Sequence, residues 1–237
     1  MGSSGQGGTG GDPGPSRVQG DRRRAGPLVV LRGWLGLVSA LAALVVIVLG
    51  VRYAGEGAPG RVDARVQDGL YGVEPPWRHL ARTLDALGEP AGAGSLGFAA
   101  VSCCLLFRRP RDAVFAAVGM GLPVVAATLL KHVVGRTIHG AENLSYPSGH
   151  TAFLTAVALV VALLARGPRA LPVLAAAVAA GAAMGWAQVA LGAHYPTDAL
   201  AGWCTALALV PPAGWLVDRA AGRPAGRSAD DVRPERS

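Results

Sequence analysis

The residues that could do chemistry lie at a few polar positions in the second half of the chain. Lys131 closes one apolar segment, and Arg136 follows it. Pro147-Ser148-Gly149-His150 opens the next apolar segment, and His194 is followed four positions later by Asp198. Lys131 is also the only lysine among 22 lysines and arginines, so its position calls for a reason. Ionisable groups within membrane-like segments are costly and tend to be functional, which makes this set a candidate site.

The first part of the set has the composition of an oxyanion site. Ser148 is a favourable N-cap residue, so we expect a helix to begin there, with Gly149 and His150 in its first turn. The free amides and the dipole of that turn attract anions, and a glycine lets an oxyanion approach the backbone. Lys131 and Arg136 add two cations, and an arginine can bind phosphate with a planar fork. We expect Arg136 to lie just beyond its helix and to fold back toward a tetrahedral oxyanion.

His194 and Asp198 supply the reactive part. Pro196 fits the first turn of a helix, which places Asp198 in that turn and within reach of the His194 ring. A carboxylate in that place fixes the tautomer of the imidazole and stabilises its protonated form. The other ring nitrogen can then act as a nucleophile or a base. Alone, a His-x3-Asp pair is more often a helix-capping contact, but beside an anion site it indicates catalysis.

Long apolar segments must position these residues. The chain of 237 residues is 51% hydrophobic and only 16% charged, which excludes a disordered chain and argues against a soluble bundle. An all-α bundle of six transmembrane helices is the predicted fold class. The six segments are residues 33–51, 91–107, 113–131, 151–164, 171–191 and 199–217.

The net charge of +7 comes largely from arginines near the ends of these segments. This placement is typical of membrane topology and argues against nucleic-acid binding. If six spans alternate, the basic N-terminal stretch, the connections around 108–111 and 166–169, and the C-terminal stretch share one side. The positive-inside rule makes that side cytoplasmic, which places the candidate site at the extracytoplasmic face of the cell membrane.

The rest of the chain divides by composition. Residues from Trp77 to Leu87, within the mixed-charge loop 54–90, show apolar side chains at helical spacing and predict a short amphipathic helix at the interface. The three cysteines lie in apolar segments and show no metal or disulfide pattern. The expected regions are a disordered cytoplasmic tail (1–26), a membrane domain (27–218, with its core at 91–217) and a second disordered cytoplasmic tail (219–237).

The polar motifs resemble those of the type 2 phosphatidic acid phosphatase (PAP2) family, which shares its fold with the vanadium haloperoxidases. That family has three motifs: Lys-x6-Arg-Pro, Pro-Ser-Gly-His and Ser-Arg-x5-His-x3-Asp. The chain contains the second motif in full at residues 147–150, keeps Lys131 of the first, and keeps His194 and Asp198 of the third. The resemblance covers roughly residues 91–217.

The resemblance implies an integral-membrane phosphatase that needs no cofactor and no metal. His194 would attack phosphorus and form a phosphohistidine, with Asp198 orienting its ring, and His150 would protonate the leaving group. Water would then release inorganic phosphate. The substrate would be a lipid phosphomonoester or diphosphate, of the polyprenyl or phosphatidic acid type. The phosphoryl oxygens would be held by Lys131, Arg136, Ser148 and Gly149.

Two departures from the family motifs weaken this expectation. Ile138 and His139 stand where the first motif has Arg-Pro, and Ala187 and Gln188 stand where the third has Ser-Arg. Each missing charge-assisted hydrogen bond would be worth about 1.5–3 kcal/mol. His139 and Gln188 could act as auxiliary donors to an oxyanion.

Two other functions stay open from the sequence. A non-catalytic or weakly active relative would bind lipid phosphates without hydrolysing them, as the missing arginines allow. A transferase would pass the phosphoryl or head group to an acceptor other than water. The sequence does not indicate which lipid is the substrate or what the oligomeric state is.

Overall fold

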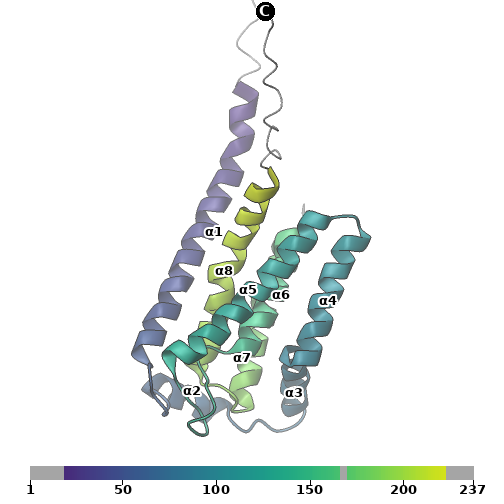
Figure 1. The fold of residues 1–237 in the computed structure, drawn as a ribbon. Coiled ribbons are helices and arrows are strands. Elements are labelled where there is room, and N and C mark those ends of the chain that lie inside the picture. Colours follow the sequence, from purple (N-terminus) through teal and green to yellow (C-terminus); the bar gives the residue numbers. More distant parts are fainter. Residues whose placement is uncertain (1–18, 166–169, 223–237) are drawn as a thin grey trace, which may run out of the picture. The chain divides into compact units, whose positions relative to one another are not determined.

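The computed structural model describes residues 19–165 and 170–222, and these residues are helical except for their connections. The helices (Figure 1) are α1 (Gln19–Arg52), α2 (Arg61–Leu70), α3 (Trp77–Gly88), α4 (Pro90–Leu106), α5 (Pro110–Val134), α6 (Gly149–Leu164), α7 (Ala170–Ala190) and α8 (Pro196–Gly222). Residues up to Leu35 and residues from Gly36 onward form two separate units. The second unit contains every residue of the candidate site.

Six apolar helices occur at the predicted places, but fewer than six are long enough to span a membrane. Four qualify in the described residues: α1 from Gly33, α5, α7 and α8. A fifth span arises if α3 and α4, which meet at a bend of 63°, are counted together. Helix α6 has 16 residues, which is about 24 Å at 1.5 Å per residue and less than the roughly 30 Å of a hydrocarbon core. The expected six-span count is therefore not confirmed.

The two expected tails fall largely outside the described residues, which leave out 1–18 and 223–237. The parts that are described are helical, because α1 already begins at Gln19 and α8 continues to Gly222. The membrane-like helices therefore extend into both segments that composition assigned to tails.

Helices α5, α6 and α8 form the core of the second unit. Phe115 and Phe153 fill the space between them, and Ala116, Ala156 and Ala206 are fully buried. Small residues of this kind let helix backbones approach closely within a bilayer. On the outside, large apolar side chains stay exposed, with Phe98 at 77% and Val133 at 79%. A surface of this kind is suited to contact with lipid.

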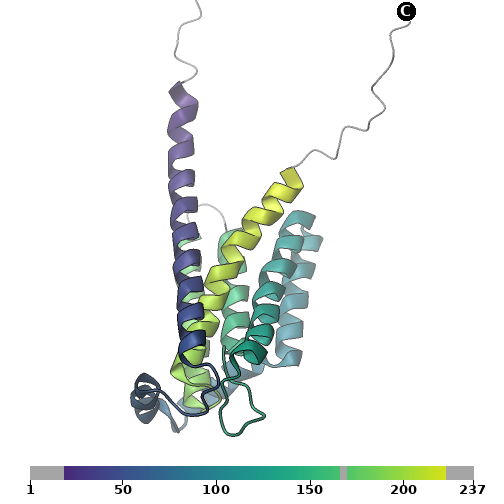
Figure 2. The ribbon, with the colours of Figure 1, turned by 60° about the vertical axis from the view of Figure 1, so that its left-hand side comes forward.

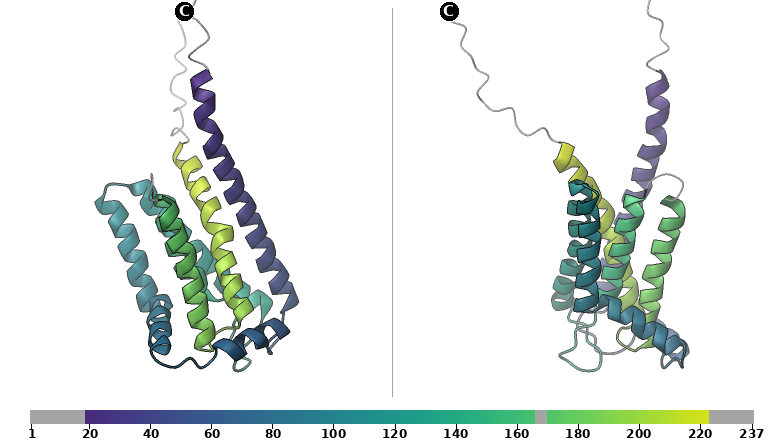
Figure 3. Two further views of the ribbon diagram at one scale, coloured as in Figure 1. Left: turned by 180° about the vertical axis from the view of Figure 1, so that it is seen from behind. Right: turned by 90° about the vertical axis from the view of Figure 1, so that its right-hand side faces the viewer.

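Two short helices cover one end of this bundle. Helix α3 confirms the predicted amphipathic helix, whereas α2 was not predicted. Both lie at the end where α5 and α7 finish and α6 and α8 begin, as the views in Figures 2 and 3 agree. The predicted site residues stand at the same helix ends, so α2 and α3 border the candidate site.

Candidate active site

The start of α6 is built as the sequence predicts. Ser148 is its N-cap residue, and the Ser148 hydroxyl oxygen accepts from the Thr151 amide at 3.4 Å and from the Thr151 hydroxyl at 3.1 Å. The Ser148 amide donates to the backbone oxygen of Asp198 at 3.0 Å. A Cβ atom on Gly202 would lie 2.3 Å from the Ser148 carbonyl oxygen, so only glycine allows this approach. The second and third motifs are therefore joined directly through their backbones.

His194 lies buried beside two of the predicted site residues. Only 8% of its surface is exposed, and its Nδ1 atom is buried with no hydrogen-bond partner in the described part of the chain. Burial, with smaller contributions from the charges of Lys131 and His150, lowers the pKa of His194 to about 3. His194 is consequently a neutral imidazole at neutral pH.

Asp198 does not hold the His194 ring in the expected way. Its Oδ1 atom accepts from Arg136 Nη1 at 2.6 Å, and its Oδ2 atom accepts from the Tyr195 amide at 3.3 Å. Within residues 19–165 and 170–222, no hydrogen bond joins Asp198 to His194. The structure differs from the expectation because an arginine and a backbone amide already satisfy this carboxylate.

Arg136 is enclosed by protein groups. Its side chain is fully buried; Nη2 lies 2.6 Å from Asp63 Oδ2, and Nη1 donates to the Thr197 hydroxyl at 2.7 Å. The guanidinium carbon lies 4.0 Å from the centre of the Tyr53 ring and 4.3 Å from that of Tyr195. Arg136 does fold back beyond its helix, but its fork faces carboxylates and aromatic rings, whereas the sequence predicted an open oxyanion site.

Local backbone geometry explains this path. Helix α5 ends at Val134, and Gly135 adopts a left-handed conformation with φ 63°, which turns the chain inward at Arg136. Asp63 of α2 meets it and also accepts from the Thr197 amide at 2.9 Å. Sequence reasoning missed Asp63, since Arg136 and Thr197 lie 73 and 134 positions away and no local pattern marks such a contact.

Lys131 has donors left over for an oxyanion. It lies in the last turn of α5, half-buried, and its Nζ atom donates to the Leu144 carbonyl at 2.6 Å. An ammonium group has three donors, so two remain for a substrate oxygen. With His194 nearby, Lys131 is the cation best placed to attract a phosphate.

Where the chain departs from the family motifs, the residues present already contact other protein groups. His139 Nε2 donates to the Gly192 carbonyl at 2.8 Å, and the Ile138 side chain is buried. Gln188 is 1% exposed, and its amide donates to Asp85 Oδ1 at 2.7 Å. The structure thus gives His139 and Gln188 roles in holding neighbouring segments.

Two carboxylates from the α3–α4 region face the second histidine. His150 Nε2 lies 3.5 Å from Asp85 Oδ1 and 3.6 Å from Glu89 Oε1. The ligand atoms of these three residues all lie within 4.8 Å of one another, a spacing that suits a shared cation, either a proton or a metal ion. The sequence did not predict this cluster, because both acids belong to loop 54–90, in which acidic and basic residues are mixed without a recognisable pattern.

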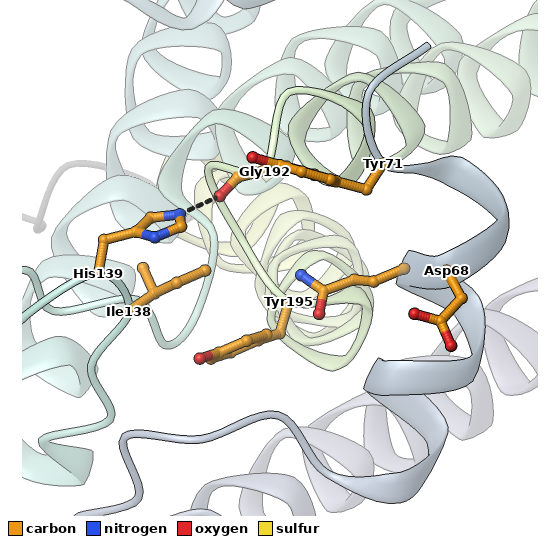
Figure 4. Close-up of a pocket in the computed structure, with 7 residues that line it drawn as sticks. Asp68, Tyr71, Ile138, His139, Gly192 and Tyr195 are labelled. Carbon is orange, nitrogen blue, oxygen red and sulfur yellow. Dashed lines mark hydrogen bonds between the residues drawn. The ribbon is translucent and has the colours of Figure 1, made fainter.

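A pocket of about 440 Å³ lies beside the turn that carries His194, where Gly192 and Tyr195 line it (Figure 4). Asp68 and Tyr71 of the α2 region line one side, and Ile138 and His139 line the other. Neither His194 nor Lys131 is among its lining residues, and its one charged group is a carboxylate. The pocket therefore adjoins the candidate site and does not itself have the charge of a phosphate site.

Comparison with known proteins gave one finding. A family model described as the PAP2 superfamily matches residues 112–220, which run from α5 to α8 and include all three motif regions. No curated protein and no solved structure matched the chain. Over residues 112–220, the chain is therefore similar to the PAP2 superfamily.

Proposed function

We propose that the protein is an integral-membrane phosphatase that hydrolyses a lipid phosphomonoester or diphosphate. The match to the PAP2 superfamily suggests phosphatase activity, and the apolar helices suggest association with a bilayer. The observation that carries the proposal is a buried His194, whose Nδ1 atom has no hydrogen-bond partner in the described residues, just before a helix start that is joined to Ser148 by the 3.0 Å bond from the Ser148 amide to the Asp198 backbone oxygen. A neutral imidazole can attack phosphorus, and a neighbouring ammonium can attract the phosphate.

The proposed reaction has two steps. A ring nitrogen of His194 attacks phosphorus, the bond from phosphorus to the leaving oxygen breaks, and His150 gives that oxygen a proton. Water then attacks the phosphohistidine, the bond from phosphorus to nitrogen breaks, and His150 takes a proton from the water. Lys131, the Ser148 hydroxyl and the Gly149 amide hold the phosphoryl oxygens, because a helix start leaves its first amides free. No cofactor or metal takes part in these steps.

Arg136 has a different part in this proposal. Its contacts with Asp63 and Asp198 support a positioning role, in which it fixes the start of α8 near His194. Lys131 and the start of α6 then carry the oxyanion alone. A site with fewer cations predicts weaker phosphate binding than the complete family motifs would give.

The location of the site suits a substrate with a polar head and an apolar tail. The motif residues stand at helix ends near α2 and α3, where a head group can enter while its tail stays in the bilayer. If the α3–α4 pair and α6 cross the membrane together with the four longer helices, the arginine distribution supports cytoplasmic termini and a site at the extracytoplasmic face of the cell membrane. Polyprenyl phosphates or diphosphates and phosphatidic acid are the proposed substrate types.

Phosphate release tests the proposal. Purified protein in detergent is given polyprenyl phosphate, polyprenyl diphosphate, phosphatidic acid and p-nitrophenyl phosphate, with and without vanadate. We expect release from at least one lipid, inhibition by vanadate, no loss with a chelator, and no activity in His194→Ala. His79→Ala is the matched control, because this exposed histidine lies outside the site.

Other outcomes would select the alternatives. If neither the wild type nor His194→Ala releases phosphate, and the protein still binds lipid phosphate, the result would support a non-catalytic binding protein. Turnover that depends on an alcohol acceptor and yields little free phosphate would support a transferase.

A further inference from the structure

His150 is held between two acids that the PAP2 match does not include. Asp85 lies in the last turn of α3, and Glu89 lies at the junction of α3 and α4, whereas the family match begins at residue 112. Gly88 lies between them in sequence, and a Cβ atom there would be 2.2 Å from His150 Cδ2. The absence of a side chain at residue 88 therefore lets the ring approach both carboxylates.

Asp85 is itself fixed in place. The Gln188 amide donates to Asp85 Oδ1 at 2.7 Å, and Gln188 is 1% exposed, so the donor is anchored in α7. The same oxygen lies 3.5 Å from His150 Nε2. One carboxylate thus connects the histidine of the second motif with the position where the third motif has lost its arginine.

The two histidines of the site have opposite surroundings. His194 is buried and influenced by the positive charges of Lys131 and His150, which disfavour its protonated form. His150 Nε2 is a buried atom with no hydrogen-bond partner in the described residues, and two carboxylates stand at 3.5 Å and 3.6 Å. Carboxylates at this distance attract an imidazolium and form charge-assisted hydrogen bonds once the proton is present. Such paired environments separate an acid from a nucleophile.

We propose that Asp85 and Glu89 are positioning residues for His150: they hold its protonated ring through Nε2 so that Nδ1 gives its proton to the leaving oxygen. This inference rests on the proposed phosphatase function. When the bond from phosphorus to the leaving oxygen breaks, the proton of Nδ1 moves to that oxygen, and the carboxylates stay ionised. Water returns a proton to Nδ1 in the second step.

The first test compares leaving groups. An alkyl phosphate needs a proton at its leaving oxygen, whereas p-nitrophenyl phosphate has a good leaving group and needs little help. General acid catalysis contributes about 10²–10⁴-fold. We expect Asp85→Asn combined with Glu89→Gln to lower kcat on the alkyl substrate by about 10–100-fold and to change the aryl rate by less than about 3-fold. Glu74→Gln, which removes an exposed charge from the same loop, should change neither rate.

The second test asks whether the loss passes through His150. In a His150→Ala background, the same two substitutions should change the alkyl rate by less than about 2-fold, because the group they act on is gone. Asp85→Glu should restore most of the activity lost in Asp85→Asn. Equal losses on both substrates, or a full further loss in the His150→Ala background, would overturn the proposal. Loss of wild-type activity on chelation would instead make the cluster a metal site and would also overturn it.

A measurement without substrate separates this inference from the phosphatase proposal. Nuclear magnetic resonance of ¹⁵N-histidine-labelled protein, with His150→Ala to identify the signal, follows the protonation of His150. The titratable groups that interact with its ring are Asp85, Glu89 and His194. We expect the ¹⁵N signals of the His150 ring to shift in the double variant, because Nε2 loses both carboxylates beside it, and to stay in place in Glu74→Gln. Unchanged ¹⁵N signals in the double variant refute the positioning role even if the protein is an active phosphatase. The expected signal shift in a protein that hydrolyses none of the substrates refutes only the phosphatase function.

Discussion

Asp63→Asn tests whether the Arg136 cluster supports the structure or binds substrate. The Asp63 carboxylate is fully buried and accepts from Arg136 Nη2 at 2.6 Å, from the Thr197 amide at 2.9 Å and from the Thr197 hydroxyl at 3.0 Å. Asparagine keeps the shape but removes the charge and turns one acceptor into a donor. Breaking a buried ion pair costs about 3–5 kcal/mol, and we take about 3 because Asp198 still pairs with Arg136.

That loss corresponds to a large change in thermal stability. A domain of 150–250 residues loses about 2–4 °C in Tm per kcal/mol, so Asp63→Asn should lower Tm by about 6–12 °C. Size-exclusion chromatography after heating in detergent measures this change. Asp68→Asn is the control, because Asp68 is an exposed acid of the same helix, and its Tm should change by less than about 2 °C. A small shift in Tm for Asp63→Asn, together with altered vanadate affinity in the folded protein, would show that Arg136 binds the oxyanion.

Three further changes have defined outcomes. Below pH 6.5 the unfolded chain binds a proton at His194 more readily than the folded protein, in which the pKa of His194 is about 3. The Tm should therefore fall as the pH is lowered from 6.5 to 4, and it should fall less in His194→Gln. Equal slopes of Tm against pH in the two proteins would contradict this. Gln188→Arg should not improve vanadate affinity, since the new guanidinium would pair with Asp85, and a clear gain would refute that placement. Gly202→Ala should lower stability by about 1–3 kcal/mol in a thermal assay because it pushes α8 away from the Ser148 carbonyl, and Gly97→Ala, which meets open space, is its control.

Local patterns predicted the parts of the site that depend on neighbouring residues. The N-cap at Ser148 and the amphipathic helix α3 follow from short-range spacing, and the structure confirms both. The sequence also predicted the group of Lys131, His150 and His194, because each stands at the end of an apolar segment on the same side of the bundle. That grouping stays a prediction.

Long-range pairings decided the rest. Arg136 looked like a phosphate ligand because its charge is visible in the sequence, but the choice between substrate and carboxylate depends on Asp63, which is 73 positions away. The place of Asp85 in the site could not be predicted for the same reason, since its contact with Gln188 spans 103 positions. Helix α6 was predicted as a span from its composition, whereas its 16 residues make it shorter than a hydrocarbon core.

The most direct test of the account is to trap the covalent intermediate. Protein is mixed with a ³²P-labelled lipid phosphate from the panel above, quenched within milliseconds in alkali, and analysed for protein-bound label. The account predicts label that is stable in base, labile in acid, located at His194 by peptide mapping, and lost in His194→Ala but kept in His79→Ala. Substrate turnover without such label, or label that persists in His194→Ala, would contradict the central claim that His194 is the nucleophile.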